Sequence, residues 1–405
     1  MEKIGMTPFY AEKEKTDISK WNMEQAEVIN YFHRSFQEYK ETPLCNLKNL
    51  ARELSVENIL VKDESYRFGL NAFKVLGGSY AVACYIAKQL HRDMKGMTYS
   101  LLTDENVKEK LGHMTFITAT DGNHGRGIAW TADRLGQRCV VYMPKGSAAE
   151  RLANIRRLGA DASITDLSYD DAVQKAKADA EENGWVLVQD TAWDGYEEIP
   201  SYIMQGYLTM SYEALAQMQA ENIEMPTHIF LQAGVGSMSG ALTAFFANIY
   251  QDSRQKPIIV IVEPHKADCI YQTAKANDGM LHSVTGKMDT IMAGLACGVP
   301  CTVGWNIMRD YADYAITIPD AVAAKGMRVL ANPIGEDSKV VSGESGASTL
   351  GTVVEILSNP VYKDIKDELR LNENSRILCF STEGATDKEN YRRIVWDGAY
   401  SSEPS

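Results

Sequence analysis

The sequence has few cysteines, and none of them has the paired spacing that metal sites use. Its 405 residues include seven cysteines, an odd number, and no two of them are separated by two residues. Cys297 and Cys301 lie close together, but no further Cys or His stands at the spacing that completes a tetrahedral ligand set. Dispersed thiols are typical of a reducing compartment, so we expect no metal site and no disulfide, including none between Cys269 and Cys297.

The sequence also lacks an excess of positive charge and any long hydrophobic run. Lys and Arg number 41 against 54 for Asp and Glu, which gives a formal net charge of −13. Because phosphate surfaces attract basic proteins, this balance argues against nucleic acid or an anionic membrane as a partner. No apolar run approaches the length of a membrane span, and the first residues contain no hydrophobic signal segment. We therefore expect a cytoplasmic protein whose partner is a small molecule.

Strand and helix signals alternate through the chain, with short connections and no internal repeat. Apolar runs predict strands at residues 58–62, 114–119, 138–143, 185–188, 228–231, 257–262 and 376–380. Continuous apolar runs are typical of strands buried on both faces of a parallel sheet, and amphipathic stretches such as 148–158 and 170–182 separate them. This pattern predicts an α/β fold, and the length predicts two domains or one large domain with a lobe.

A polar, glycine-rich turn at residues 120–127, TDGNHGRG, follows one of these strands. It presents the carboxylate of Asp121, the amide of Asn123 and the imidazole of His124 at the carboxyl end of a strand, where open α/β sheets bind their ligands. Its glycines let the main chain come close to a flat or anionic group. The alternative is a plain strand-to-helix turn in which Asp121 caps the helix.

Lys74 is predicted in the first turn of a helix within residues 69–94, with Asn71 as the N-cap. The positive end of the helix dipole disfavours an ammonium there and so favours the neutral amine, which is the form that adds to an aldehyde. Gly77 and Gly78 lie inside the same helix, where each costs about 1 kcal/mol relative to alanine, so we expect another group to approach that face closely. The alternative is an ordinary surface lysine on a helix with two packing glycines.

A second glycine-rich loop follows the strand at residues 228–231 and precedes a long helix, in LQAGVGSMSGALTAF. Main-chain N–H groups at such a helix start form an anion site, so residues Gly234 to Ser237 are predicted to hold a phosphate. No Walker lysine follows, which argues against a nucleoside triphosphatase. A dinucleotide site is the competing interpretation, since Glu263 ends the next strand where a ribose-binding acid would stand.

Pyridoxal phosphate is the cofactor that needs a lysine amine, a phosphate site and polar side chains from separate strands of one fold. Its ring nitrogen would find a hydroxyl at the end of the last predicted strand, in FSTEGATD, where either Ser381 or Thr382 could be the partner. A hydroxyl, unlike a carboxylate, does not force protonation of the ring nitrogen. This choice favours β-elimination over transamination.

The chain resembles the tryptophan synthase β, or fold type II, family of pyridoxal phosphate enzymes. The resemblance runs through KDESYRFGLNAFKVLGG, TDGNHGRGIAW, YMPKGSAAER, VQDTAWDGY, LQAGVGSM, VEPHKADCIY, TIMAGLACG, VVSGESGA and STEGATD. Dehydratases and synthases of this family usually have a serine or threonine before the Gly-Asn-His turn and Ser-Phe-Lys at the cofactor lysine. This chain has Asp121 and Ala72-Phe73-Lys74 instead. The departures indicate the branch that acts on 2,3-diaminopropionate.

The resemblance implies a role for each motif. Lys74 would bind the cofactor aldehyde, Asn123 would contact the ring hydroxyl oxygen, and Gly234, Val235, Gly236 and Ser237 would hold the phosphate. Asp121 and Asp190 would be acidic residues of the active site. An anion suits a substrate with a cationic β-amine, and a second base can remove an α proton from a face that Lys74 does not reach.

We therefore expect Lys74 to serve the L isomer and Asp121 the D isomer, with Asp190 binding the β-ammonium or assisting its departure. The alternative for Asp190 is a cap in a strand-to-loop turn. Glu344, in the SGESGA loop, receives no role.

The implied reaction is α,β-elimination of 2,3-diaminopropionate to pyruvate and two ammonia molecules. A serine or threonine dehydratase of the same fold is the main alternative, and it explains every motif except Asp121. A nicotinamide-dependent oxidoreductase explains only the Gly234 loop and Glu263, and a non-catalytic cofactor-binding protein leaves Asp121 and Asp190 without a use.

The fold implied by the resemblance has two open, twisted, mostly parallel sheets flanked by helices, with the cofactor in the cleft between two domains. Residues 1–79 and 200–405 would form the large domain and residues 80–199 the small one, whose movement would exclude water. Most relatives of this fold are dimers, so a homodimer is expected.

Overall fold

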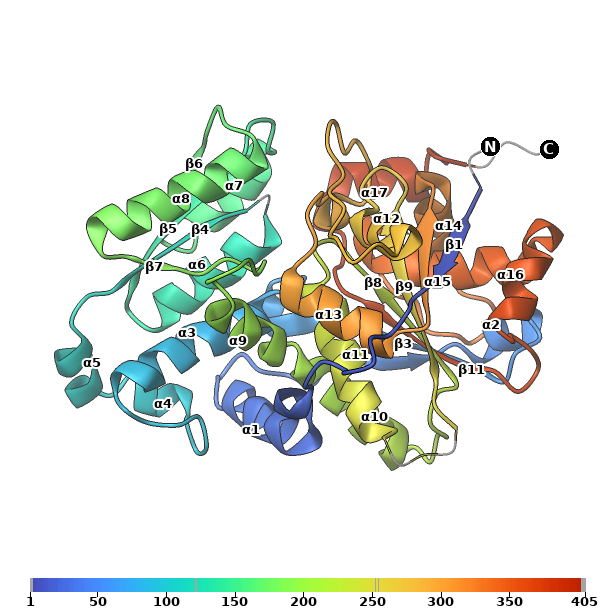
Figure 1. Cartoon of the computed structure of the whole chain (residues 1–405), viewed down its shortest axis with the longest axis horizontal. Helices are drawn as coiled ribbons and strands as arrows, with labels where there is room; N and C mark the ends of the chain where they lie inside the picture. The colour runs from blue at the N-terminus through green and yellow to red at the C-terminus, as the bar shows by residue number, and fades with distance from the viewer. Residues whose placement is uncertain (1–2, 121, 252, 254, 402–405) are drawn as a thin grey trace. The chain divides into compact units, whose positions relative to one another are not determined.

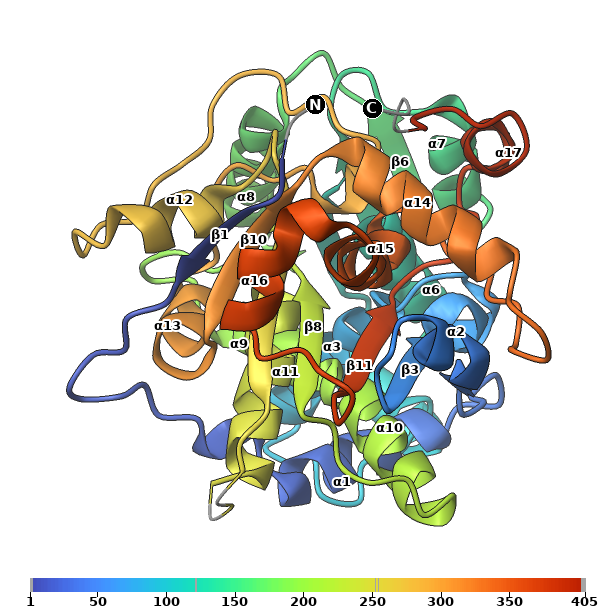
Figure 2. The same cartoon turned by 90° about the vertical axis from the view of Figure 1, so that its right-hand side faces the viewer.

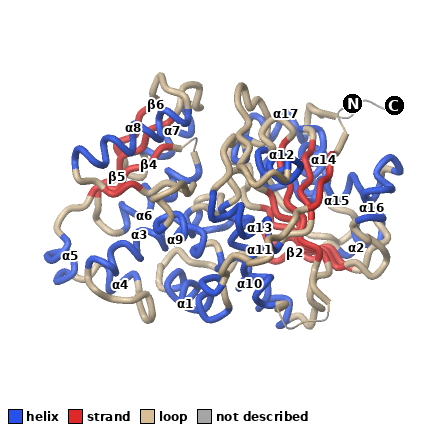
Figure 3. Tube along the Cα trace, in the orientation of Figure 1, coloured by secondary structure: helices blue, strands red, loops and turns tan. Residues whose placement is uncertain are grey.

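The computed structural model describes residues 3–120, 122–251, 253 and 255–401. The chain forms two compact units, of which unit 1 comprises Met1–Met23, Glu41–Ala72 and Met210–Ser405, and unit 2 comprises Glu24–Lys40 and Phe73–Thr209. The predicted small domain, 80–199, lies within unit 2, and its limits stay a prediction. Each unit contains one sheet with helices packed against it (Figure 3).

The sheet of unit 1 has seven strands in the order β1-β10-β9-β8-β11-β3-β2. These are β1 (Gly5–Pro8), β2 (Leu44–Asn46), β3 (Asn58–Asp63), β8 (His228–Gln232), β9 (Ile258–Pro264), β10 (Tyr314–Ile318) and β11 (Arg376–Ser381). The inner strands are parallel, and β1 and β2 pair antiparallel at the two edges. Because β8 and β11 are neighbours and parallel, the loops that follow them leave the same edge of the sheet side by side.

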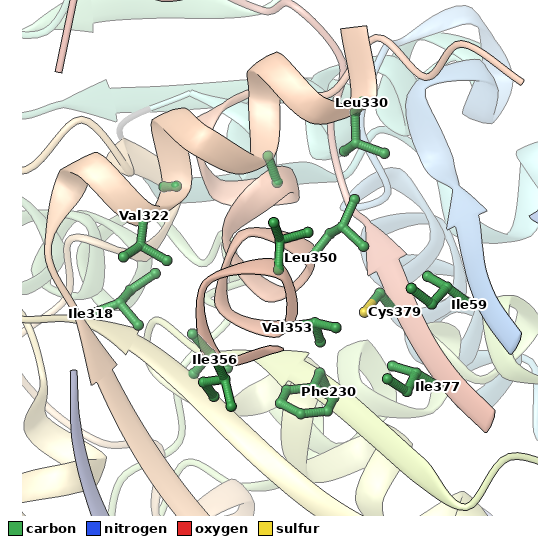
Figure 4. Packing of buried hydrophobic residues seen from close by; sticks show 14 of the residues in the cluster. Ile59, Phe230, Ile318, Val322, Leu330, Leu350, Val353, Ile356, Ile377 and Cys379 are labelled. Atoms are coloured by element: carbon green, nitrogen blue, oxygen red, sulfur yellow. The ribbon is translucent and has the colours of Figure 1, made fainter. Parts of the chain in front are cut away.

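The core of unit 1 lies between its sheet and the helix pair α14 (Asp320–Ala331) and α15 (Glu344–Ser358), which pack against each other (Figure 2). Figure 4 shows Val353 of α15 facing Phe230 of β8 and Ile377 of β11, and Leu350 on the side of α15 toward α14; all four side chains are buried. The other helices of this unit are α2 (Lys48–Glu53), α10 (Leu208–Ala220), α11 (Ser237–Ile249), α12 (Cys269–Ala276), α13 (Thr302–Tyr311), α16 (Lys363–Glu368) and α17 (Lys388–Val395).

The sheet of unit 2 has four parallel strands in the order β6-β5-β4-β7. They are β4 (Thr115–Ala119), β5 (Arg138–Met143), β6 (Asp161–Ile164) and β7 (Val186–Leu187). The helices of the unit are α1 (Met23–Arg34), α3 (Val75–Gln89), α4 (Tyr99–Leu102), α5 (Glu105–Leu111), α6 (Asn123–Arg134), α7 (Ala149–Arg156), α8 (Tyr169–Asn183) and α9 (Glu198–Gly206). The parallel sheets with flanking helices confirm the predicted fold class. Among the described residues, no helix is both long enough and apolar enough to cross a bilayer.

Candidate active site

Lys74 stands where helix α3 begins, but Asn71 is not the N-cap of that helix, and this prediction was wrong. Lys74 itself occupies the N-cap position. Asn71 has a φ of +59°, a left-handed turn conformation that asparagine tolerates. Its carbonyl accepts a hydrogen bond from the N–H of Gly384 at 3.0 Å. This turn and its partner therefore outweigh the local preference of Asn71 for a helix cap.

Helix α3 is held by close contacts at glycines, as the sequence predicted (Figure 1). A Cβ placed on Gly77 would lie 2.6 Å from the Tyr207 ring, and one on Gly78 would lie 2.9 Å from Ile128. From the other side, a Cβ on Gly206 of α9 would lie 2.4 Å from the main-chain oxygen of Leu76. Separations under 3 Å exclude any side chain there, so α3 has almost no freedom to shift at the end that carries Lys74.

An ion pair joins Lys74 to Asp190. The Lys74 Nζ donates to the Asp190 Oδ2 at 2.7 Å, and the side chains are 20% and 7% exposed. Burial raises the pKa of Asp190, but the Lys74 ammonium and then His124 outweigh that effect and lower the pKa to about 2. Asp190 is therefore a buried carboxylate that stays ionised at neutral pH. Its side chain pairs with Lys74, as a residue of the site would.

The TDGNHGRG turn follows β4 and starts helix α6, in which Gly122 occupies the N-cap position and Asn123 is the first residue. The turn is anchored by the Gly122 N–H, which donates to the Thr120 Oγ1 at 3.0 Å. The His124 ring is buried, with Nε2 2.8 Å from the Val188 carbonyl oxygen and Nδ1 3.9 Å from the Asp190 Oδ2. The structure therefore brings Lys74, His124 and Asp190 together, whereas the predicted Asp121 lies outside the described residues.

Buried ion pairs hold the turn that precedes Lys74 in the chain. Arg67 is fully buried and pairs with Glu64 at 2.7 Å and with Glu213 at 2.8 Å. Lys62 reaches Glu213 at 2.7 Å, and Thr42 donates to Glu64 at 2.7 Å. Two cations therefore balance two anions within the core of unit 1, and sequence reasoning missed this cluster because KDESYRF resembles an ordinary solvated charge run.

The Gly234 loop of unit 1 has the geometry of an anion site. It leaves β8, and Gly236, with a φ of +93°, takes the N-cap position of α11. The first main-chain hydrogen bond of that helix runs from the Gly240 N–H to the Gly236 oxygen. The N–H groups in the first turn of an α-helix point out of the helix end, where an anion can accept from them. A phosphate bound there would also meet the positive end of the dipole of a 13-residue helix.

Of the two candidate hydroxyls at the end of β11, Ser381 and Thr382 have different partners. The Ser381 Oγ donates to the Ser342 Oγ at 2.8 Å, and both residues are fully buried. The Thr382 Oγ1 accepts from the Gln232 Nε2 at 2.9 Å, so its own proton is directed elsewhere. Gln232 was not predicted as a site residue. It ends β8, which is parallel to and beside β11, and this position in the sequence could have indicated that it meets Thr382.

Glu263 excludes the dinucleotide interpretation. Its carboxylate accepts from the main-chain N–H groups of Ile270 at 3.0 Å and Tyr271 at 2.7 Å, at the start of α12. The side chain is almost completely buried, and burial raises its pKa well above the ordinary value. A carboxylate that caps a helix in the core is not placed to bind a ribose.

Two further buried acids, Glu344 and Glu383, follow the serine-rich loop and β11. Burial, followed by the charge of Glu383, raises the pKa of Glu344 to about 7. The Glu344 Oε1 accepts from the Asn390 Nδ2 at 2.5 Å. Glu344 begins helix α15, so its carboxyl group belongs to the protein's internal polar network rather than to an exposed loop.

Each half of the chain fits one part of pyridoxal phosphate. Unit 2 supplies an amine at the start of a helix and fixes it beside a carboxylate. Unit 1 supplies a helix start at Gly236, whose φ of +93° is strained for any residue with a Cβ. It also supplies a buried hydroxyl, Thr382, with a proton to donate. Within unit 2 the amine suits an aldehyde, and within unit 1 the helix start suits a phosphate and the hydroxyl a ring nitrogen.

Comparison with known proteins agrees with this donor set. The family model described as pyridoxal-phosphate dependent enzyme matches residues 36–380. The chain belongs to this family, which is the class that the fold and the site define, and pyridoxal phosphate is its cofactor.

More specific relatives are diaminopropionate ammonia-lyases. The protein of Salmonella typhimurium is 50% identical over 368 residues, which cover 91% of each chain, and that of Escherichia coli K12 is 47% identical over 95% of this chain and 94% of the relative. The holo crystal structure of the Escherichia coli enzyme superposes with a TM-score of 0.91 at 44% identity, covering 99% of both chains. Within the family, the chain groups with these ammonia-lyases.

Proposed function

We propose that this enzyme eliminates ammonia from 2,3-diaminopropionate to give pyruvate and a second ammonia. The Lys74–Asp190 pair carries this proposal, because it sets a permanent anion beside the amine that meets the substrate. A substrate with a cationic group on its β carbon needs such an anion, whereas the hydroxyl of serine does not. A relative described as L-threonine dehydratase is only 23% identical, which favours the diamino acid over the dehydratase alternative.

Lys74 is the residue to which the cofactor would attach. When bound, pyridoxal phosphate supplies an aldehyde for an amine and a ring that accepts the electron pair left when a bond at the α carbon breaks. The Lys74 Nζ would take the α proton of the L isomer once the substrate amine has displaced it. The glycine contacts of α3 hold this nitrogen in place, so little reorganisation is needed for the proton transfer.

Asp190 would bind the β-ammonium of the substrate. The Lys74 ammonium holds the pKa of Asp190 at about 2, and a substrate β-ammonium beside the carboxylate would keep it ionised in the same way, through a charge interaction that burial makes stronger than it would be in water. When Lys74 is neutral, the carboxylate is left for a substrate cation. The His124 Nδ1 lies 3.9 Å from the Asp190 Oδ2 and helps to keep that carboxylate ionised, and a β-ammonium leaves as ammonia without a further proton.

Asp121 would remove the α proton of the D isomer. Its support is the TDGNHGRG motif, in which an acid stands where dehydratases of this fold carry a hydroxyl. A solved structure of the Escherichia coli ammonia-lyase is described as a complex with D-serine, which shows that the related enzyme admits a D amino acid.

The remaining cofactor contacts would follow the donor set of each loop. Asn123 would contact the ring hydroxyl oxygen, and Gly234, Val235, Gly236 and Ser237 would hold the phosphate through the start of α11. Of Ser381 and Thr382, we assign the ring nitrogen to Thr382, because the Ser381 proton is already donated to Ser342.

Product stoichiometry tests the reaction. Purified holoenzyme is incubated with 2,3-diaminopropionate and, separately, with serine, and pyruvate and ammonia are measured. We expect two ammonia per pyruvate from the diamino acid and a much slower reaction of serine with one ammonia per pyruvate. Comparable turnover of serine would instead identify a dehydratase.

We also propose that the enzyme works in the cytoplasm as a homodimer, with residues 80–199 as a movable small domain. Cys269 and Cys297 both lie near Gly234 without a disulfide between them, which is consistent with a reducing compartment. Sedimentation of the holoenzyme would test the dimer, and the expected mass is twice that of the 45.0 kDa chain.

A further inference from the structure

The main-chain pairing between β4 and β7 ends before the polar residues of the site begin. Phe116 pairs with Val186 and Ile117 with Leu187, and the last main-chain bond runs from the Val188 N–H to the Ile117 oxygen at 2.9 Å. Ala119, the final residue of β4, directs its N–H and its oxygen to the same side of the strand. No main-chain partner from the β7 segment meets them there among the bonds of the described chain.

The side chain of Gln189 takes the place of that partner. Its Oε1 accepts from the Ala119 N–H at 3.1 Å, and its Nε2 donates to the Ala119 oxygen at 3.0 Å. The carboxamide also accepts from the Thr118 Oγ1 at 3.0 Å and donates to the Tyr169 hydroxyl at 2.8 Å. The side chain is fully buried. It therefore bonds to Ala119 as a peptide group of a longer strand would.

Because a side chain replaces the main-chain partner of Ala119, the main chain after Gln189 follows a different path. In a regular strand, the main chain at 189 would occupy the ladder and the following side chain would lie on a face of the sheet. Here the Gln189 side chain makes the hydrogen bonds that the main chain would make in a regular strand. The main chain therefore leaves the sheet, and Asp190 reaches Lys74. Tyr196 fixes the departing chain, since its hydroxyl accepts from the Gln189 N–H and donates to the Leu187 oxygen, both at 2.9 Å.

We propose that Gln189 is a positioning residue for the elimination reaction. By bonding to both main-chain groups of Ala119, it fixes the end of β4, from which the TDGNHGRG turn starts, relative to the segment that carries Asp190. The role rests on the proposed function of Asp190. A positioning role differs from a structural role. In a structural role, Gln189 would stabilise the strand end, and its loss would not change the reaction rate.

Two variants separate these roles. Gln189→Met keeps the length of the side chain and removes both bonds to Ala119. Thr118→Val removes the hydroxyl contact to the same carboxamide and a long contact to the Ala119 oxygen at 3.5 Å, but leaves both Gln189–Ala119 bonds in place, so it is the matched control. Cofactor loading by absorbance, thermal unfolding, and kcat and KM for 2,3-diaminopropionate are measured for each holoenzyme.

For a positioning role, we expect Gln189→Met to bind cofactor and to lose about 10- to 100-fold in kcat well below its unfolding temperature, since small misplacements of reacting groups have effects of that size. The acid limb of its pH profile should move to higher pH, because a displaced Asp190 lies farther from the substrate β-ammonium, which then holds the pKa of the carboxylate down less. Thr118→Val should stay within about 3-fold of the parent. A Gln189→Met enzyme that unfolds at lower temperature but keeps kcat and the pH profile would overturn the proposal.

A direct measurement covers the case in which Gln189→Met does not fold. Hydrogen exchange of the Ala119 amide in the unaltered protein should be slow, because its acceptor is the buried Gln189 Oε1. In Gln189→Asn, whose carboxamide is one methylene shorter and holds Ala119 less closely, exchange should be faster with a similar loss of kcat. Fast exchange in the unaltered protein would refute the bond itself. If the unaltered holoenzyme makes no pyruvate from 2,3-diaminopropionate, the proposed function fails, whereas the exchange result still decides whether Gln189 holds the strand end.

Discussion

Lys74 and Asp190 are 116 residues apart in the sequence, and their side chains meet at 2.7 Å. Lys74 begins helix α3, which makes close contacts at its glycines. Asp190 follows β7, beyond the point where the Gln189 side chain bonds to the end of β4. The two charges are therefore fixed by separate elements of one unit.

Replacement of Asp190 with asparagine should reduce kcat/KM for 2,3-diaminopropionate by about 100-fold or more, since an ionic contact to the substrate amine is lost in a buried site. Steady-state kinetics with the loaded enzyme measure this. Asp194→Asn, an exposed acid on the same loop, is the control and should leave the kinetics unchanged. Equal activity of the two variants would remove Asp190 from the mechanism.

Replacement of Asp121 with asparagine should separate the two isomers. If Asp121 removes the α proton only from the D isomer, turnover of D-2,3-diaminopropionate falls by about 100-fold or more while that of the L isomer is kept. The L isomer is the internal control for folding and cofactor loading. Equal losses for both isomers would contradict the division of roles between Lys74 and Asp121.

Thr382→Val and Ser381→Ala should differ in their effect on the bound cofactor. Thr382 has a proton to donate and Ser381 has already donated its own to Ser342, so we expect a kcat loss of about 10-fold or more and an altered absorbance spectrum only for Thr382→Val. Spectra and kcat of the two holoenzymes check this. A spectral change confined to Ser381→Ala would reverse the assignment.

Glu344 should make the protein less stable as the pH rises. Its pKa is raised by burial to about 7 in the folded state, against 4.5 for an ordinary glutamic acid, so the folded state binds an extra proton between these values. The free energy of unfolding therefore declines across that window, by an amount on the order of 2 kcal/mol.

The Glu344→Gln variant should lose this dependence and gain stability at pH 8 relative to pH 5, because the amide can still accept from Asn390. Urea denaturation midpoints at the two pH values measure the effect. Glu389→Gln, an exposed neighbour on α17, should show the slope of the parent. An unchanged slope in Glu344→Gln would mean that the group ionises normally.

Arg67→Met should destabilise the protein strongly, because it leaves the carboxylates of Glu64 and Glu213 without their shared cation in the core. Breaking one partner of a buried pair costs about 3–5 kcal/mol. Thermal unfolding of the apoenzyme measures this loss, and Lys88→Met, which breaks an exposed pair with Glu198, should cost about 1 kcal/mol or less. Similar unfolding temperatures for both variants would contradict the buried pairing.

The sequence was most informative where strands are buried on both faces. The runs at 138–143 and 228–231 correspond to β5 and β8 within one residue, because parallel strands under helices must be apolar throughout. Short edge strands such as β1 and β2 were missed, since they have few apolar residues and pair on one side only. The parallel strand β10 was missed as well, although it is apolar and mostly buried.

The residues of the site were found by motif and resemblance, but their geometry was not predictable. Nothing near Lys74 in the sequence indicates Asp190 as its partner, since the contact depends on how α3 and the end of β7 pack in unit 2. Asn71 shows the opposite case, in which a strong local preference for a helix cap was outweighed by a bond to Gly384, more than 300 residues away.

The glycine contacts around α3 also limit how this enzyme can change. A single added methyl group at Gly77 or Gly206 would collide with main chain or a packed ring, so a new substrate preference cannot be obtained by enlarging residues at this crossing. The segments that follow β4 and β7 contain the residues proposed to contact the substrate, so a change of substrate preference requires changes there. Laboratory selection for activity on other diamino acids should therefore accumulate substitutions in those loops and leave the helix crossing unchanged.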